Sequence, residues 1–90
     1  MQNDNLSPAQ CRAGRALVGW SQQELCERAQ VARKTLADFE AGKSTPYPRT
    51  AAAIRMALEA AGIEFIAENG GGAGVRFIRP TSTATAPLPD

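Results

Sequence analysis

Hydrophobic and polar residues follow the period of an α-helix through the first two-thirds of this sequence. The segment 7–10 (Ser-Pro-Ala-Gln) combines an N-cap serine, a proline at the first helical position and a glutamine that completes a capping box. It predicts a helix that runs to about Val18 and ends at Gly19, where a left-handed C-cap suits glycine. A second Ser-x-x-Glu start at 21–24 predicts another helix, which ends near Ala29.

Two more helices are predicted after a short turn. The third covers about residues 32–40 and directs one apolar stripe into the core. A loop is expected over 43–48, because its two prolines disfavour helix there. The fourth helix is expected from Arg49 or Thr50 to about Ala61, with apolar side chains at 3-4-3 spacing on one face.

The pattern then changes to the alternation of β-strands. Residues 63–66 and 75–78 flank a glycine-rich turn at 69–74, which predicts a β-hairpin. The sequence is rich in Pro, Thr and Ala from Pro80 onward, and we expect this tail to be disordered. The expected fold is mainly α: a compact four-helix domain with a C-terminal β-hairpin and a disordered tail. The expected boundaries are 1–6 for a flexible N-terminus, 7–62 for the helical domain, 63–79 for the hairpin and 80–90 for the tail.

The length and the charge distribution narrow the function. The 90 residues allow one small domain, and 43% of them are hydrophobic, as in ordinary globular proteins. The formal net charge is only +1, yet five cations stand against two acidic residues between positions 28 and 49. The cations are Arg28, Arg33, Lys34, Lys43 and Arg49. A local basic patch on a nearly neutral protein favours a defined phosphate-contacting surface over a general polycation.

The residue types argue against metal sites and catalysis. Histidine is absent and Cys11 and Cys26 are the only cysteines, so neither a zinc finger nor a Ser-His-Asp triad is possible. Both cysteines are expected to be buried, reduced thiols. The glycine cluster at 70–74 contains neither of the glycine-rich nucleotide-binding patterns. We therefore expect no enzymatic activity, no metal, no cofactor and no small-molecule ligand.

The chain is also expected to be cytoplasmic and to make no contact with a membrane. The polar segment 1–5 lacks the basic start and apolar stretch of a secretion signal. No apolar run approaches the roughly 20 residues that span a bilayer.

Two short helices joined by a tight turn, the second opening with two cations, form the layout of a helix-turn-helix. Residues 7–62 resemble the lambda-repressor-like helix-turn-helix family, the Xre/Cro group of bacterial and phage regulators. The residues that carry the resemblance are Gly19-Trp20-Ser21-Gln22-Gln23-Glu24-Leu25, Val31, Thr35-Leu36-Ala37-Asp38-Phe39-Glu40 and Gly42-Lys43. The resemblance implies a DNA-binding regulator whose third helix lies in the major groove.

The resemblance also implies a role for individual residues. The candidates for base contacts are Ala32, Arg33, Lys34 and Asp38, and the candidates for phosphate contacts are Ser21, Gln22, Gln23, Lys43, Thr45 and Arg49. An arginine can bond O6 and N7 of guanine together, and an aspartate can accept from cytosine N4. The alternative for Asp38 is an ion pair with Lys34 one turn earlier. The positions of Arg15 and Glu40 imply a largely buried structural ion pair.

Two residues depart from the family pattern at the turn. Gln30 replaces the usual glycine, so it must either accept a strained backbone or form a slightly different turn. Ala32 replaces the usual Ser or Thr cap of the third helix, a loss typically worth ~1 kcal/mol, although its methyl group can pack on a thymine methyl.

Self-association is expected at the hairpin, because an isolated two-stranded hairpin is marginal in water and one recognition helix covers few base pairs. The expected homodimer interface consists of Ile63, Phe65, Ile66, Val75, Phe77 and Ile78, with fourth-helix residues such as Leu58 as an addition. The alternative is a hairpin that merely covers the core of a monomer. A repressor that binds a (pseudo)palindromic operator in double-stranded DNA is the main hypothesis. An antitoxin that binds a toxin protein and an activator that contacts RNA polymerase are the alternatives.

Overall fold

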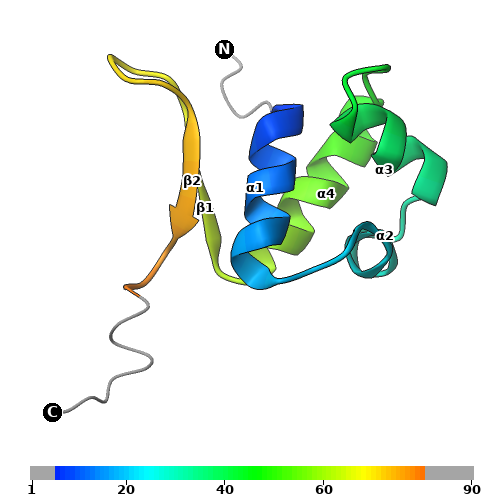
Figure 1. The fold of residues 1–90 in the computed structure, drawn as a ribbon, viewed down its shortest axis with the longest axis horizontal. Helices are drawn as coiled ribbons and strands as arrows, with labels where there is room; N and C mark the ends of the chain where they lie inside the picture. The colour runs from blue at the N-terminus through cyan, green and yellow to red at the C-terminus, as the bar shows by residue number, and fades with distance from the viewer. Residues whose placement is uncertain (1–5, 81–90) are drawn as a thin grey trace, which may run out of the picture.

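The computed structural model of the chain describes residues 6–80. Four helices are followed by one antiparallel hairpin (Figure 1). The helices are α1 (Pro8–Val18), α2 (Gln22–Ala29), α3 (Arg33–Glu40) and α4 (Pro48–Ala60), and the strands are β1 (Ile63–Ile66) and β2 (Gly74–Phe77). The hairpin stands on the side of α1 that faces away from α2 and α3 (Figure 1). This order confirms the expected four-helix fold with a C-terminal hairpin.

The core is formed by residues from one face of each helix and from the first strand. Its buried hydrophobic residues are Leu6, Cys11, Leu25, Cys26, Leu36, Phe39, Ile54, Leu58 and Ile63. These residues include Leu36 and Phe39 of the apolar stripe expected on the third helix, and Ile54 and Leu58 of the stripe expected on the fourth. Fully burying a Leu or Ile side chain contributes about 1.5–3 kcal/mol, so this cluster is the main source of the stability of the domain.

The packed domain begins earlier than the sequence predicted. Leu6 was expected within a flexible terminus, but it is buried in the core cluster, with 7% of its surface exposed. The rest of that segment, 1–5, and all but Pro80 of the predicted tail lie outside the described residues.

The first helix begins with a complete capping box, as expected. The hydroxyl oxygen of Ser7 accepts from the Gln10 backbone N–H at 3.0 Å, and the Gln10 Oε1 accepts from the Ser7 backbone N–H at 3.1 Å. The buried Gln10 Nε2 then donates to the carbonyl oxygens of Gly74 at 2.9 Å and Ile66 at 3.3 Å. One glutamine therefore starts α1 and ties the hairpin to it.

The fourth helix starts one residue before the predicted range. Pro48 was placed in a loop, but it is the first residue of α4, with Tyr47 as its N-cap. Proline is tolerated there because the first N–H of a helix has no intrahelical partner and the fixed φ of proline suits a helix.

The hairpin packs with one face against the helices. Its register pairs Ile63 with Phe77, Glu64 with Arg76, Phe65 with Val75 and Ile66 with Gly74. Side chains alternate between the two faces of a strand, so the 63, 65, 75 and 77 positions share one face. That face packs on the core, with Ile63 fully buried.

This packing corrects part of the expected dimer interface. Ile63 and Leu58 are fully buried in the core of their own chain and are unavailable to a partner. Phe65, Val75 and Phe77 pack against the same core and are only partly exposed. Of the six hairpin residues, Ile66 and Ile78 are left outside this packed face, and Ile78 is 57% exposed.

Candidate nucleic-acid interface

The turn between α2 and α3 keeps the helix-turn-helix geometry without a glycine. Gln30 adopts the left-handed conformation (φ 60°, ψ 48°) and is the only described residue other than glycine with a positive φ. The backbone N–H of Val31 donates to the Cys26 carbonyl at 3.0 Å, which closes the turn. Gln30 therefore accepts a strained backbone and does not form a different turn. The strain costs roughly 1–2 kcal/mol of folding free energy.

The recognition helix candidate, α3, starts without a side-chain cap. Ala32 has the extended backbone of an N-cap but makes no side-chain hydrogen bond, as its substitution for Ser or Thr implies. The residue is exposed, so its methyl group is accessible at the start of α3. The first backbone N–H groups of α3 therefore have no side-chain cap. They lie beside the methyl group of Ala32 and the cations Arg33 and Lys34.

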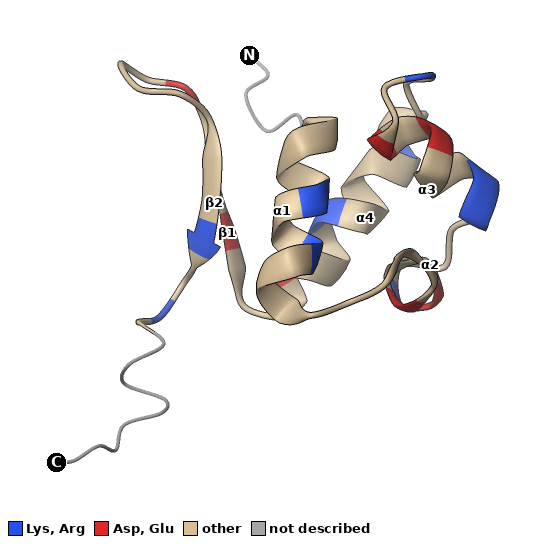
Figure 2. Ribbon diagram, viewed as in Figure 1, with Lys and Arg blue, Asp and Glu red and all other residues tan. Residues whose placement is uncertain are grey.

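Arg33 and Lys34 place their charges at the exposed start of α3 (Figure 2). The Arg33 Nη1 lies 3.3 Å from the Oε1 of Gln23 on α2. The Lys34 side chain is 87% exposed, and its Nζ lies 3.1 Å from Asp38 Oδ2. Such an exposed pair is worth about 0.3–0.5 kcal/mol and is easily exchanged for another partner. In the free protein, Asp38 thus forms the ion pair with Lys34 that was the alternative to a base contact.

The start of α2 has the form of an anion-binding site. Ser21 Oγ accepts from the Glu24 N–H at 3.0 Å, whereas the Glu24 side chain pairs with Arg28 at 2.7 Å, so the expected capping box is only half formed. The first backbone N–H groups of a helix point outward without intrahelical partners, here those of Gln22 and Gln23. Their direction and the positive end of the helix dipole favour a phosphate.

The side chain of Gln22 points toward the core rather than into solvent. Its Nε2 donates to Glu40 Oε1 at 2.9 Å. Gln23 remains exposed, with its Nε2 3.2 Å from Glu27 Oε2. The two adjacent glutamines therefore differ: one is anchored to α3 and the other lies on the surface of α2.

Arg15 and Glu40 form a two-point ion pair between α1 and the end of α3. Arg15 Nε lies 2.8 Å from Glu40 Oε2, and Nη2 lies 2.7 Å from Oε1. The Glu40 side chain is 2% exposed and that of Arg15 is 19% exposed. Burial would raise the Glu40 pKa, but hydrogen bonds from Arg15, Cys11 and Gln22 outweigh it and hold the pKa below its ordinary value.

Two further donors around Glu40 were missed at the level of sequence. The buried Cys11 thiol donates to Glu40 Oε2 at 2.9 Å, and Arg12 donates to the Glu40 carbonyl. Burial, followed by the hydrogen bond to Glu40, raises the pKa of the Cys11 thiol, so it stays protonated near neutral pH. Both residues lie within one turn of Arg15 on α1. This spacing puts them on the same side of the helix as Arg15, and it was the signal in the sequence that could have found them.

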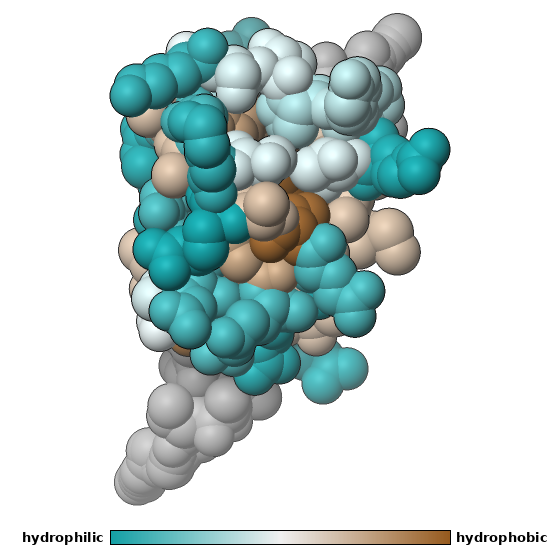
Figure 3. Space-filling model, turned by 90° about the vertical axis from the view of Figure 1, so that its right-hand side faces the viewer, coloured by the Kyte–Doolittle hydropathy of each residue, from teal (hydrophilic) through white to brown (hydrophobic). Residues whose placement is uncertain are grey.

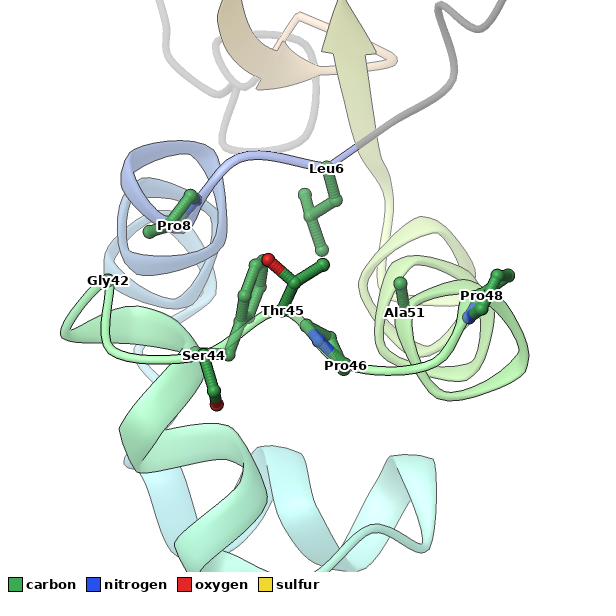
Figure 4. Close-up of a pocket in the computed structure, with 9 residues that line it drawn as sticks. Leu6, Pro8, Gly42, Ser44, Thr45, Pro46, Pro48 and Ala51 are labelled. Atoms are coloured by element: carbon green, nitrogen blue, oxygen red, sulfur yellow. The ribbon is translucent and has the colours of Figure 1, made fainter.

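The remaining phosphate candidates lie around the loop between α3 and α4. Lys43 is exposed directly after the turn at Gly42, and Arg49 is exposed in the first turn of α4. Thr45 is exposed as well, and its side chain also lines a cleft of about 350 Å³ beside Leu6 (Figure 4). Thr45 therefore stays a candidate for a phosphate contact.

One of the candidate cations is already paired with neighbouring side chains. Arg28, counted in the basic patch, pairs with Glu24 and lies 4.6 Å from the ring centre of Trp20. The side of the molecule that carries α2 and α3 is mostly hydrophilic around a small hydrophobic patch (Figure 3). The other candidate cations are also exposed: Arg33 and Lys34 lie at the start of α3, Lys43 after its end and Arg49 at the start of α4.

The described residues hold no group of three or more His, Cys, Asp or Glu side chains suited to a metal ion. Within the same residues, no helix is long and apolar enough to cross a membrane.

The comparison with curated proteins returned no match. A helix-turn-helix family model matches residues 12–62, which is more than half of the chain and includes the α2–turn–α3 unit. The fold, the buried Arg15–Glu40 pair and the exposed cations of α3 agree with the family resemblance of the sequence. This chain belongs to the Xre/lambda-repressor-like helix-turn-helix family of DNA-binding transcriptional regulators, which is not an enzyme family.

Proposed function

We propose that the protein is a transcriptional repressor that binds a (pseudo)palindromic operator as a homodimer. The observation that carries this proposal is the exposed, cationic start of α3 on a helix-turn-helix scaffold. Arg33 and Lys34 read base edges from the major groove, and Ala32 contacts a thymine methyl group. Asp38 exchanges its ion pair with Lys34 for a cytosine amino group.

Phosphate contacts hold α3 in the groove. Ser21, Gln22 and Gln23 contribute them from the start of α2, where free backbone N–H groups and the helix dipole favour an anion. Lys43, after the end of α3, and Arg49, at the start of α4, contact further phosphates of the DNA backbone. Phosphate contacts fix the register on DNA but carry little sequence information, so specificity comes from the residues of α3.

The dimer forms through the free side of the hairpin. Hydrogen-bonded and non-hydrogen-bonded pairs alternate in an antiparallel sheet. Because the Ile78 N–H donates to the Gly62 carbonyl at 2.8 Å, the backbone groups of Val75 and Phe77 point away from β1, toward the open edge of β2. An open edge favours pairing with another strand, and two copies of β2 related by a two-fold axis are self-complementary.

Repression follows from occupancy. A dimer bound at a promoter blocks polymerase without a further activity.

Sedimentation equilibrium with and without operator DNA tests the dimer. The wild-type protein is expected to be a dimer on DNA, and Ile78→Asp is expected to stay folded but to lose dimerisation and operator affinity together. Met56→Asp is the matched control, because Met56 is a hydrophobic residue of comparable exposure, 64% against 57% for Ile78, but lies on α4. A wild-type monomer on DNA, or loss of the dimer in Met56→Asp alone, would overturn the hairpin dimer.

A further inference from the structure

Four side-chain hydrogen bonds converge on the buried carboxylate of Glu40. Arg15 donates to both oxygens, Cys11 donates to Oε2 and Gln22 donates to Oε1. Arg15 and Cys11 come from α1, where Cys11 is buried and Arg15 is partly buried. Gln22 is also partly buried but differs from them, because it is the first residue of α2.

The hydrogen bond to Glu40 fixes the orientation of the Gln22 amide. A carboxylate only accepts, so the nitrogen of the amide must face Glu40 and the oxygen must face away. Glu40 cannot turn to follow another partner, because Arg15 holds both of its oxygens at 2.7 and 2.8 Å. The amide is therefore held against an acceptor that is itself held from two sides.

An amide nitrogen carries two N–H groups, and the hydrogen bond to Glu40 uses one of them. No other protein group in the described part of the chain bonds the side chain of Gln22. Its second N–H is therefore available beside the outward-pointing backbone N–H groups of Gln22 and Gln23 at the start of α2.

We propose that Glu40, held by Arg15, is a positioning residue for DNA binding: it aims the second N–H of the Gln22 amide at one phosphate in each half-site. The inference rests on the proposed function, since it concerns the phosphate contacts of the same interface. It assigns a DNA-dependent role to an ion pair that joins α1 to α3 and whose Arg15 also donates to the Trp20 carbonyl, just before α2. Glu40 itself makes no contact with DNA.

Single substitutions of Glu40 or Arg15 strand a charge and lower stability, so they do not separate positioning from folding. The variant Arg15→Met/Glu40→Leu avoids this problem, because replacing a buried ion pair with apolar residues is often neutral or stabilising. It removes the acceptor for Gln22. Because it also removes the Arg15 donor to the Trp20 carbonyl and the acceptor of the Cys11 thiol, it is compared with Gln22→Ala, which leaves both of those bonds in place. The matched control is Arg55→Met/Glu59→Leu, which removes an ion pair within α4.

The test is a methylphosphonate scan of the operator, in which one phosphate at a time loses its charge. Wild-type protein is expected to lose about tenfold in affinity at one particular phosphate per half-site. Gln22→Ala and Arg15→Met/Glu40→Leu should each bind unmodified operator about tenfold more weakly, and each should lose much less affinity than the wild type when that phosphate is neutralised. The control variant should keep the wild-type pattern, and melting curves of all variants should show folded protein.

A second measurement needs no substitution. In the ¹⁵N NMR spectrum of the wild-type protein, operator binding should slow solvent exchange of one Gln22 side-chain proton while the proton bonded to Glu40 stays protected. A purely structural ion pair predicts that affinity follows thermal stability in every variant, with no change confined to one phosphate.

Three outcomes overturn the inference and leave the proposed function standing. They are a wild-type phosphate pattern in Arg15→Met/Glu40→Leu, a wild-type pattern in Gln22→Ala, and loss of the Gln22–Glu40 hydrogen bond on binding DNA. A wild-type protein that prefers no DNA sequence at all refutes the proposed function itself.

Discussion

The Arg15 guanidinium donates hydrogen bonds to both oxygens of the Glu40 carboxylate, at 2.8 and 2.7 Å, across the interface between α1 and α3. Removing one partner leaves the other charge buried and unpaired, which typically costs about 3–5 kcal/mol. Arg15→Ala and Glu40→Ala are therefore each expected to lower the free energy of unfolding by about that amount in urea titrations. Glu24→Ala, which breaks the exposed pair with Arg28, should cost less than about 1 kcal/mol. Similar small losses at all three positions would contradict a structural role for the buried pair.

Stability is expected to fall in acid because of Glu40. Its pKa is lowered in the folded state, so the unfolded chain binds a proton more readily as the pH falls below the ordinary value of 4.5. The stabilisation is complete above that pH and is lost as the pH falls through the lower folded-state pKa. Urea titrations from pH 6 to pH 3 measure this loss, and Arg15→Met/Glu40→Leu should show a smaller one. An equal acid sensitivity in that variant would assign the effect to other carboxylates.

Glycine is expected to stabilise the turn between α2 and α3. Gln30 has a φ of 60°, which costs a residue with a Cβ atom roughly 1–2 kcal/mol but costs glycine nothing. Gln30→Gly should therefore raise the free energy of unfolding by about 0.5–1 kcal/mol, since the added freedom of the unfolded chain offsets part of the gain. Thermal melts measure the difference, with Gln23→Gly as the control: the same substitution inside α2 should be destabilising. A loss of stability in Gln30→Gly would show that the glutamine side chain stabilises the turn.

Arg33 is expected to determine one base of the operator. Arg33→Ala should cost about 1–3 kcal/mol of binding free energy and should relax the preference at a single base position. Anisotropy titrations with operators that carry each base at that position measure both effects. A loss of equal size on every sequence would make Arg33 a phosphate contact instead.

Much of the helical fold could be predicted from sequence because its boundaries are set locally. Ser7, Pro8 and Gly19 begin and end α1 through their own backbone preferences. The one misplaced helix start, at Pro48, shows the limit of this reasoning: proline disfavours the interior of a helix but suits its first position. Whether a proline ends a loop or begins a helix depends on where the helix starts. For Pro48, packing of the loop between α3 and α4 decides this, and local sequence does not.

The hairpin shows a different limit. Alternation predicted both strands, but it does not tell which face meets the core of the same chain. Contacts of β1 and β2 with α1 and α4 decide this, and they bury Ile63. The Gln10 side chain, which bonds Ile66 and Gly74, joins residues more than fifty positions apart, and no local pattern signals such a bond.

At the candidate interface, sequence predicted the residue types better than their partners. The exposed cations of α3 follow from the helical period, since one face must point away from the core. The anchoring of Gln22 to Glu40 was not predicted, because it requires the start of α2 to lie beside the end of α3. The pairing of Lys34 with Asp38 was foreseen as an alternative because the two residues lie one turn apart.

We propose that α3 of this protein reads a specific, two-fold symmetric DNA site. Selection of bound sequences from a random double-stranded pool tests it most directly, because it measures binding, symmetry and spacing in one experiment. We expect an enriched (pseudo)palindrome whose half-sites lie about 10 base pairs apart, centre to centre, and an affinity that falls steeply with salt. Enrichment of no sequence over the starting pool would contradict it.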